Sequence, residues 1–317
     1  MNKKYLLFLG LFIGSVICFF LILIILSIPE FFEFNWNQAL RDTFIGADLF
    51  FQIITELGGT IIYFAFFLVI YWAINKQAAR GLLLVYAASD FVNYYAKSII
   101  ANERPPKSEW LAGASHLSTP SGHAMSSSVY WGYTAMKAKR WWTTILCVLI
   151  IILVGLSRMY LGVHWFGDIL TGWLFAFIIL STAWMIGEYL QKFYSEKNLI
   201  LFYIGLALFG FIFLIITQLL FPSQEHNFGS SAGKMIGLGV GSVLELKYVK
   251  FDINPSSGKK WHLILRILFG LIMVGGIFLV LYLVIPQSIF WLVAIQYIVV
   301  LVIGIFLWPL IFKKLRI

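Results

Sequence analysis

The chain alternates between long apolar runs and short polar connections. A run of about 20 apolar residues is long enough to cross the hydrocarbon layer of a bilayer as a helix. Ten runs of this kind are found, near residues 5–28, 50–73, 80–100, 121–136, 142–157, 165–187, 199–221, 229–248, 263–285 and 289–312. The first run exceeds the apolar part of a cleavable signal peptide, so we expect it to remain as a helix. The pattern predicts an all-α, polytopic membrane protein with about ten transmembrane helices.

The composition supports a membrane protein. The chain has 317 residues, of which 61% are hydrophobic and 12% are charged, whereas soluble domains carry about 25% charged residues. The net charge of +9 does not indicate nucleic-acid binding, because most Lys and Arg residues lie in short connections between apolar runs, as membrane topology requires. Cys18 and Cys147 both lie in apolar runs, so neither a disulfide framework nor a thiol metal site is expected.

The positive charges predict the orientation in the membrane. If the N-terminus is placed inside the cell, most of the 23 Lys and Arg residues fall in cytoplasmic connections, which is the usual bias. We therefore expect a multi-pass protein of the plasma (inner) membrane with both termini in the cytoplasm. Residues 29–49 form the first outer segment and mix aromatic with charged positions. This mixture suits equally a helix lying in the interface and a structured loop held by aromatic side chains.

Two basic residues lie at the outer end of the third predicted helix. Lys97 and Arg104 are seven residues apart, nearly two helical turns, so both could lie on one helix face. Pro105 disfavours helical geometry at Arg104, so the helix is expected to end about there. Two fixed cations could grip a phosphate through charge-assisted hydrogen bonds. They could equally be ordinary basic residues that extend toward the membrane surface.

A second polar segment, Pro120-Ser121-Gly122-His123, opens the fourth predicted helix on the same outer side. Thr119 could supply the capping hydroxyl, with the proline in the first turn. The free N–H groups at such a helix start bind anions, and a glycine lets a phosphate approach the backbone closely. The histidine could then protonate a leaving group, although a capped helix with an interfacial histidine would show the same sequence.

The third polar segment is the most specific. His164 and Asp168 are four residues apart at the outer start of the sixth predicted helix, so they could share one helix face. A carboxylate that accepts the imidazole Nδ1–H fixes the tautomer and leaves Nε2 as a nucleophile. Arg158, one short loop earlier, could clamp a phosphate with two N–H groups. A surface His–Asp pair and a metal site are the alternatives that remain at this point.

Together the three segments read K-x6-RP, PSGH and SR-x5-H-x3-D, with every fixed position filled in order. In this the chain resembles the type 2 phosphatidic acid phosphatases (PAP2), membrane lipid phosphatases whose catalytic domain also occurs in bacterial acid phosphatases and vanadium haloperoxidases. The resemblance covers about residues 50–187 and implies a six-helix catalytic core. We predict two parts: residues 1–198, with the core, the N-terminal helix and the interfacial segment, and residues 199–317, a four-helix extension of unknown role.

The resemblance also implies a role for each motif residue. His164 would attack phosphorus and form a phosphohistidine, Asp168 would orient His164, and His123 would protonate the departing alkoxide. The phosphoryl oxygens would be held by Lys97, Arg104, Ser121, Gly122 and Arg158. No metal or other cofactor is implied, since cationic side chains stabilise the charge. The implied protein is a metal-independent hydrolase that removes a terminal phosphate from a lipid phosphate or pyrophosphate at the non-cytoplasmic face. Its expected partners are the lipids of the bilayer, and a homo-oligomer is an open alternative.

One feature of the extension stands out. Gly229, Gly233, Gly237 and Gly241 recur at every fourth residue and are followed by Glu245. Glycines at this spacing form a smooth strip on one helix face, which permits close packing of helices. An internal helix pair, a subunit interface and a second lipid or ion site would all use such a strip. Glu245 is expected to be a helix-end group near the inner face.

Two other functions fit parts of the sequence. Vanadate-dependent halide oxidation is compatible with the resemblance, although a chain embedded in lipid suits a lipid substrate better. A transporter or flippase for a phosphorylated lipid or anion would also need about ten helices and central cations. Its binding site should lie near the middle of the membrane, whereas the three motifs are all predicted at outer helix ends.

Overall fold

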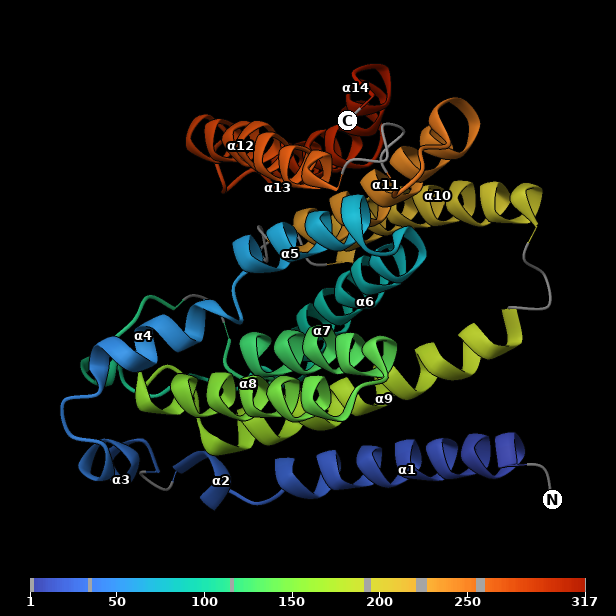
Figure 1. Ribbon diagram of the computed structural model, residues 1–317. Coiled ribbons are helices and arrows are strands. Elements are labelled where there is room, and N and C mark those ends of the chain that lie inside the picture. The colour runs from blue at the N-terminus through green and yellow to red at the C-terminus, as the bar shows by residue number, and fades with distance from the viewer. Residues whose placement is uncertain are drawn as a thin grey trace. The chain divides into compact units, whose positions relative to one another are not determined.

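The computed structural model describes residues 3–33, 36–114, 117–190, 195–220, 227–254 and 260–316, and every regular element in these ranges is a helix (Figure 1). The predicted all-α class is confirmed. The α-helices are α1 (Lys3–Leu26), α2 (Glu30–Glu33), α3 (Trp36–Thr43), α4 (Asp48–Glu56), α5 (Thr60–Ala73), α6 (Lys76–Ile100), α7 (Gly122–Ala138), α8 (Trp141–Tyr160), α9 (Phe166–Leu190), α10 (Glu196–Leu220), α11 (Asn227–Leu244), α12 (Trp261–Val284), α13 (Phe290–Val302) and α14 (Trp308–Lys314). Short π-helical turns continue α11 over Glu245–Val249 and join α13 to α14 over Ile303–Leu307.

Six helices of the described chain are long and apolar enough to cross a membrane. They are α1, α8, α9, α10, α12 and the continuous helix Phe290–Lys314. The pair α4 and α5, which meets at a bend of 45°, would form a seventh crossing. The protein is therefore a multi-pass membrane protein. The predicted count of ten crossings is not confirmed, because α6, α7 and α11 bury polar and charged side chains that make them less apolar.

The first predicted outer segment, residues 29–49, contains two short helices, α2 and α3, rather than one interfacial helix. The rings of Trp36 and Phe31 lie 5.3 and 6.0 Å from the ring of Phe166 at the start of α9. Arg41 donates a hydrogen bond of 2.8 Å to the carbonyl of Tyr160 at the end of α8. Aromatic and polar contacts thus hold the segment against the helices beside it, although part of it, residues 34–35, lies outside the described residues.

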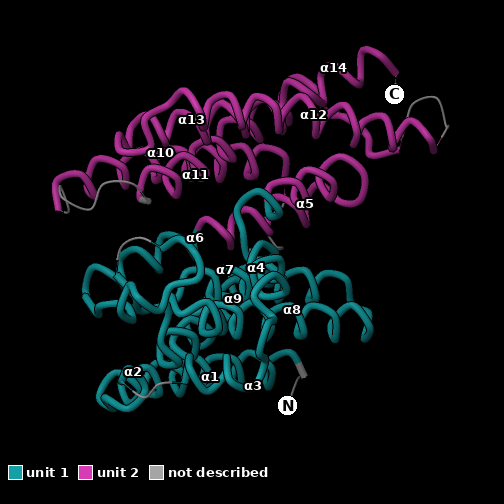
Figure 2. The backbone as a smooth tube through the Cα atoms, turned by 90° about the vertical axis from the view of Figure 1, so that its left-hand side faces the viewer, with its two compact units in different colours: residues 1–63, 88–190 teal, residues 64–87, 191–317 magenta. Residues whose placement is uncertain are grey.

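The chain forms two compact units, which Figure 2 distinguishes by colour. Unit 1 contains residues 1–63 and 88–190, and unit 2 contains residues 64–87 and 191–317. The predicted boundary at residue 198 kept residues 64–87 with the core, whereas these residues contact the C-terminal helices. Within unit 2, for example, the Trp72 Nε1–H donates to the Gly304 carbonyl at 2.8 Å. The division into a catalytic part and an extension stays a prediction about function.

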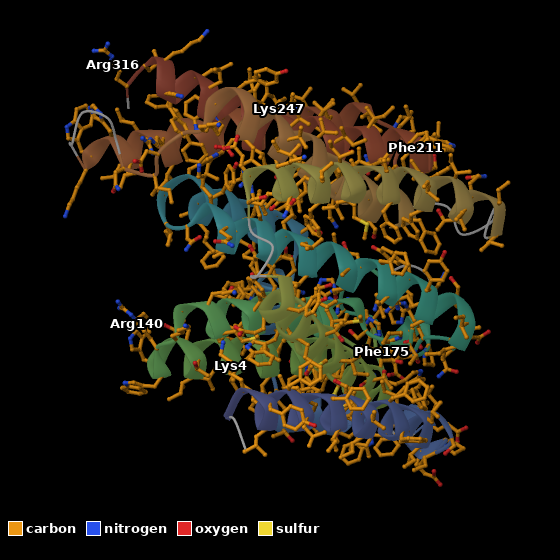
Figure 3. All side chains as sticks on the ribbon, turned by 90° about the vertical axis from the view of Figure 1, so that its right-hand side faces the viewer. Lys4, Arg140, Phe175, Phe211, Lys247 and Arg316 are labelled. Atoms are coloured by element: carbon orange, nitrogen blue, oxygen red, sulfur yellow. The ribbon has the colours of Figure 1, made fainter. Side chains whose placement is uncertain are left out.

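Unit 1 has two chemically different ends. α7 packs against α8 and α9, α1 packs along α9, and α4 packs against α8. Lys4 near the start of α1 bonds Glu188 near the end of α9 at 2.8 Å, and Figure 3 places Lys4 and Arg140 at the same end of the unit. Since α7, α8 and α9 follow one another up and down, the start of α7, the end of α8 and the start of α9 meet at the opposite end. All three sequence motifs lie there.

In unit 2 the glycine strip of α11 packs against α13. A Cβ atom on Gly229 would lie 2.2 Å from the Phe290 carbonyl oxygen, and one on Gly233 would lie 2.5 Å from the Ala294 carbonyl oxygen. A side chain at either position would therefore overlap the backbone of α13. The strip is used for an internal helix pair, the first of the alternatives that the sequence left open.

Glu245, at the end of the strip, is a fully buried charge rather than a helix-end group. Its carboxylate accepts hydrogen bonds from Arg80 and, at 3.0 Å, from Lys76, both on α6. The side chain of Glu245 is 0% exposed and that of Arg80 is 8% exposed. This burial and pairing could not be predicted from the sequence, because the partners lie more than 160 positions away and only the fold brings them together.

Candidate active site

The catalytic pair that the sequence suggests is formed in the structure. The Nδ1 atom of His164 lies 3.1 Å from the Oδ2 atom of Asp168, and both side chains are almost completely buried. α9 begins at Phe166, so His164 lies in the preceding loop and Asp168 lies in the first helical turn. The i, i+4 contact therefore closes across the start of a helix rather than along its face.

Arg104 shows which nitrogen of His164 carries the lone pair. Its Nη1 atom lies 3.0 Å from the His164 Nε2 atom and donates to the Val163 carbonyl at 2.6 Å. A guanidinium group has only donors, so Nε2 must be the acceptor. In the neutral imidazole the proton then resides on Nδ1 and faces Asp168. The network thus assigns to His164 the tautomer with its proton on Nδ1 and its lone pair on Nε2.

Asp168 is held by more groups than the motif suggests. Its carboxylate accepts hydrogen bonds from the hydroxyls of Ser118 and Thr119, and from the backbone N–H of Trp165 at 2.7 Å. The Ser118 Oγ atom also lies 3.3 Å from the His164 Nδ1 atom. A buried carboxylate needs such donors to remain charged. The two hydroxyl residues were missed by the sequence analysis as partners of the carboxylate.

The start of α7 corrects one expectation. Thr119 was expected to cap the helix, but α7 begins at Gly122 and its N-cap is Ser121, whose Oγ accepts from the Ala124 N–H at 3.4 Å. The Thr119 hydroxyl is taken by Asp168 instead. The backbone N–H of Ser121 donates to the Asp168 carbonyl at 2.9 Å. The second and third motifs are thereby joined through their backbones.

Lys97 and Asn93 on α6 fix the segment that leads into α7. The Lys97 ammonium donates to the carbonyls of Leu117 at 2.6 Å and Ser118 at 2.7 Å. One turn earlier, the Asn93 Nδ2–H donates to the Pro120 carbonyl at 3.1 Å. The Asn93 Oδ1 atom lies 3.4 Å from the position of a Cβ on Gly122. Asn93 was not singled out from the sequence, although its spacing of four residues from Lys97 places both on one helix face.

Arg158 extends the site to α4. Its Nη1–H donates to the Thr55 hydroxyl at 2.9 Å, and the side chain is buried. The Nε–H has no hydrogen-bond partner within the described part of the chain. A buried donor of this kind is costly unless a ligand satisfies it. A phosphate oxygen would supply the missing acceptor, so Arg158 is suited to bind an anion.

His123 lies in the first turn of α7 and is half-buried. Its Cδ2 atom lies 3.2 Å from the position of a Cβ on Gly58 in the α4–α5 connection, so the ring approaches this glycine closely. The ring lies within electrostatic range of Arg104 and Arg158. The histidine is thus placed beside the cations that would hold a phosphate, where an acid could reach an ester oxygen.

Burial and positive charge act on His164 in the same direction. Burial is the largest cause, followed by the charges of Arg104, Lys97 and Arg158, and together they hold the pKa of His164 well below its usual range. Burial also lowers the pKa of Arg104, which the charge of Asp168 partly offsets. At neutral pH His164 is therefore a neutral imidazole with a lone pair on Nε2. Within the ranges that the structure describes, no three His, Cys, Asp or Glu side chains gather as a metal site would require.

The comparisons with known proteins identify the family. Residues 78–192 match the PAP2 superfamily, and residues 229–317 match the transmembrane extension of PAP2 superfamily phosphatases. The chain thus contains a PAP2 superfamily domain and the transmembrane extension of PAP2 superfamily phosphatases. The first match contains all eight predicted site residues, and the second contains the glycine strip and Glu245. The predicted resemblance is confirmed, whereas the individual role of each site residue stays a prediction.

Several PAP2 relatives have names that specify a substrate. The chain is 28% identical to sphingosine-1-phosphate phosphatase 1 of Rattus norvegicus over 69% of its own length and 56% of the relative. It is 24% identical to lipid phosphate phosphatase delta of Arabidopsis thaliana over 64% of its length and 53% of the relative. The chain thus spans just over half the length of these curated relatives.

A solved structure is also similar to the chain. It is the crystal structure of a transmembrane PAP2-type phosphatidylglycerolphosphate phosphatase from Bacillus subtilis. The sequence identity is 22%, the TM-score is 0.48, and the alignment covers 57% of this chain and 99% of that one.

Proposed function

We propose that the protein is an integral membrane phosphohydrolase that removes a terminal phosphate from a lipid phosphate. The observation that carries the proposal is the contact between Arg104 and the Nε2 atom of His164, beside the buried Asp168. This contact supports the proposal, because an imidazole lone pair beside a guanidinium group is suited to attack a phosphate that the guanidinium binds. The names of the relatives, a sphingosine-1-phosphate phosphatase and a lipid phosphate phosphatase, support the same class of reaction.

In the first step the substrate phosphate displaces His164 from Arg104. The phosphoryl oxygens accept hydrogen bonds from Arg104, from the unused Nε–H of Arg158, and from N–H groups at the start of α7. The Nε2 lone pair attacks phosphorus, an N–P bond forms, and the bond from phosphorus to the lipid oxygen breaks. Asp168 keeps the Nδ1–H in place and stabilises the positive charge that develops on the ring.

Proton transfer completes both halves of the reaction. The bound phosphate dianion favours the protonated form of His123, which gives its proton to the departing lipid alkoxide. The neutral His123 then takes a proton from water as the water oxygen attacks phosphorus, and the N–P bond breaks. Inorganic phosphate leaves and His164 returns to its neutral form. Lys97 positions the segment before α7 through two backbone carbonyls.

We also propose that the site opens on the extracytoplasmic side, with both termini in the cytoplasm. Support comes from the charge distribution, since Lys4 and Arg140 lie at one end of unit 1 and the motifs lie at the other. A cysteine at Gly113, where a side chain meets no other atom within 4 Å, should react with an impermeant thiol reagent in intact cells. A cysteine at Arg140 should react only after permeabilisation. The reverse pattern would overturn this orientation.

The reaction itself is tested with purified protein in detergent. Release of inorganic phosphate is measured with phosphatidic acid, phosphatidylglycerol phosphate, a sphingoid phosphate and undecaprenyl pyrophosphate. We expect turnover of at least one substrate that persists in EDTA, inhibition by vanadate, and acid-labile labelling of His164 from a radioactive phosphate ester. Binding of these lipids without any release of phosphate would support a transporter instead.

A further inference from the structure

The connection between α4 and α5 reaches into the candidate site. The Thr55 hydroxyl accepts from Arg158 at 2.9 Å, and Gly58 packs against the ring of His123. The Trp131 Nε1–H of α7 donates to the Leu57 carbonyl at 3.1 Å. The connection is thus fixed to α7 and α8, and it forms a fourth segment of the site that none of the three sequence motifs includes.

One carboxylate lies at the end of α4, directly before this connection. Glu56 lies between the residue that bonds Arg158 and the residue that packs on His123, and its side chain is exposed. Its Oε2 atom lies 3.2 Å from the position of a Cβ on Gly59, which directs the carboxylate along the connection. Glu56 is also close enough to act electrostatically on Arg158. A negative charge therefore lies at the rim of an otherwise cationic phosphate site.

A carboxylate in this position does not help to bind a phosphate. It repels the phosphoryl oxygens, and it repels a pyrophosphate more strongly because a second negative group would approach the rim. A cationic group on the substrate near the phosphate would be attracted, and a charge-assisted hydrogen bond to the carboxylate would form. Selectivity often depends on such a repulsive element as well as on an attractive one.

We propose that Glu56 determines substrate specificity, selecting lipid monophosphates that carry an ammonium group close to the phosphate over monophosphates without one and over pyrophosphates. The proposal rests on the proposed phosphohydrolase function and specifies its substrate class. The competing role for Glu56 is structural: the carboxylate lies near the start of α5, where a negative charge stabilises a helix N-terminus, and it partly balances Arg158.

The test compares three probes in the same detergent micelles. Sphinganine 1-phosphate has an ammonium group, lysophosphatidic acid with a tail of similar length has none, and farnesyl pyrophosphate has a second phosphate. The wild-type protein should show the highest kcat/KM for sphinganine 1-phosphate. Glu56→Gln, which removes the charge and keeps the shape, should lower its preference over lysophosphatidic acid about tenfold and raise relative turnover of the pyrophosphate. Glu56→Asp should retain most of the preference.

The matched control is Glu103→Gln, which removes an exposed carboxylate from the loop after α6 and should leave both ratios unchanged. If Glu56→Gln changes kcat/KM for all three probes by one common factor, Glu56 has a structural role and the proposal is wrong. If the wild-type protein hydrolyses the probes without preferring the ammonium lipid, the proposal is also wrong while the phosphohydrolase function stands. If it hydrolyses no lipid phosphate at all, both proposals are overturned.

Discussion

Each of the two units buries a cluster of charges, and the clusters differ in how far they are closed. In unit 2, Glu245 is bonded by Arg80 and Lys76, and the guanidinium of Arg80 also lies 5.6 Å from the ring centroid of Tyr71. The ammonium of Lys76 also donates a hydrogen bond of 2.6 Å to the Phe251 carbonyl. Both cations are therefore paired with a carboxylate of the protein itself, although the Nε–H of Arg80, like that of Arg158, has no hydrogen-bond partner among the described residues.

In unit 1 the two arginines of the site are bonded to neutral groups instead. Asp168 is bonded by hydroxyl and backbone donors, while Arg158 donates to the hydroxyl of Thr55 and Arg104 donates to a backbone carbonyl and a histidine lone pair. An excess of buried positive charge is unfavourable until an anion enters. The difference indicates that the cluster in unit 1 is built for a ligand and the cluster in unit 2 is built for the fold.

The sharpest test of this comparison is His164→Ala. Loss of the nucleophile removes the covalent route, so turnover should fall by about 10⁴-fold or more, while the thermal unfolding temperature in detergent changes little. His123→Ala should reduce kcat by about 10²–10⁴-fold, the usual contribution of a general acid. Substantial turnover by purified His164→Ala protein would contradict the mechanism.

Glu245→Ala should show the opposite profile. It leaves the buried Arg80 and the partly buried Lys76 without their counter-ion, and breaking a buried pair typically costs about 3–5 kcal/mol. We expect a large loss of thermal stability, with specific activity preserved in the protein that remains folded. Glu196→Ala is the control, because its ion pair with Lys250 is more than half exposed and should contribute little. A stable Glu245→Ala protein without activity would show that unit 2 takes part in the chemistry.

The sequence predicted the helical class, and the structure brings residues of the three motifs into contact, whereas their roles stay a prediction. His164 and Asp168 could be paired from a separation of four residues alone. Ser118, Thr119 and Asn93 could not be assigned, since their contacts depend on how α6 and α9 pack around the start of α7. Glu245 was misjudged for the same reason. The predicted count of ten crossings was not confirmed. Hydropathy alone does not separate a helix that faces lipid from a helix with a buried polar face.

Gly237→Leu tests packing in unit 2 away from its charges. A Cβ on Gly237 would lie 2.9 Å from the Leu301 Cβ and 3.1 Å from the Ile298 Cα. A leucine must push α11 and α13 apart, and such overpacking typically costs about 1–3 kcal/mol. Thermal stability should fall while KM stays unchanged. Gly276→Leu is the matched control, because a Cβ there meets no atom within 4 Å. Equal losses from both substitutions would argue against a packed strip.

The smallest expected effect is a shift in the pH dependence of the reaction. The free enzyme needs neutral His164, so kcat/KM should rise with pH as His164 loses its proton, at a pH well below the usual range for histidine. Arg104 is the largest charged contributor to that lowered pKa. Arg104→Gln removes this repulsion, so the pKa of His164 should rise and the acidic limb should move to higher pH, in addition to a loss of phosphate affinity.

The substrate complicates this profile, because a phosphate monoester also titrates near pH 6. The part of the pH profile that comes from the phosphate of the free lipid keeps its midpoint when the protein is changed. Only a change in the midpoint of the acidic limb between variants therefore reports on His164. Lys107→Gln, on the exposed part of the same loop, should leave the profile unchanged. If Arg104→Gln weakens binding without moving the acidic limb, Arg104 does not control the protonation of His164. The tautomer inferred from their contact would then not be the reactive one.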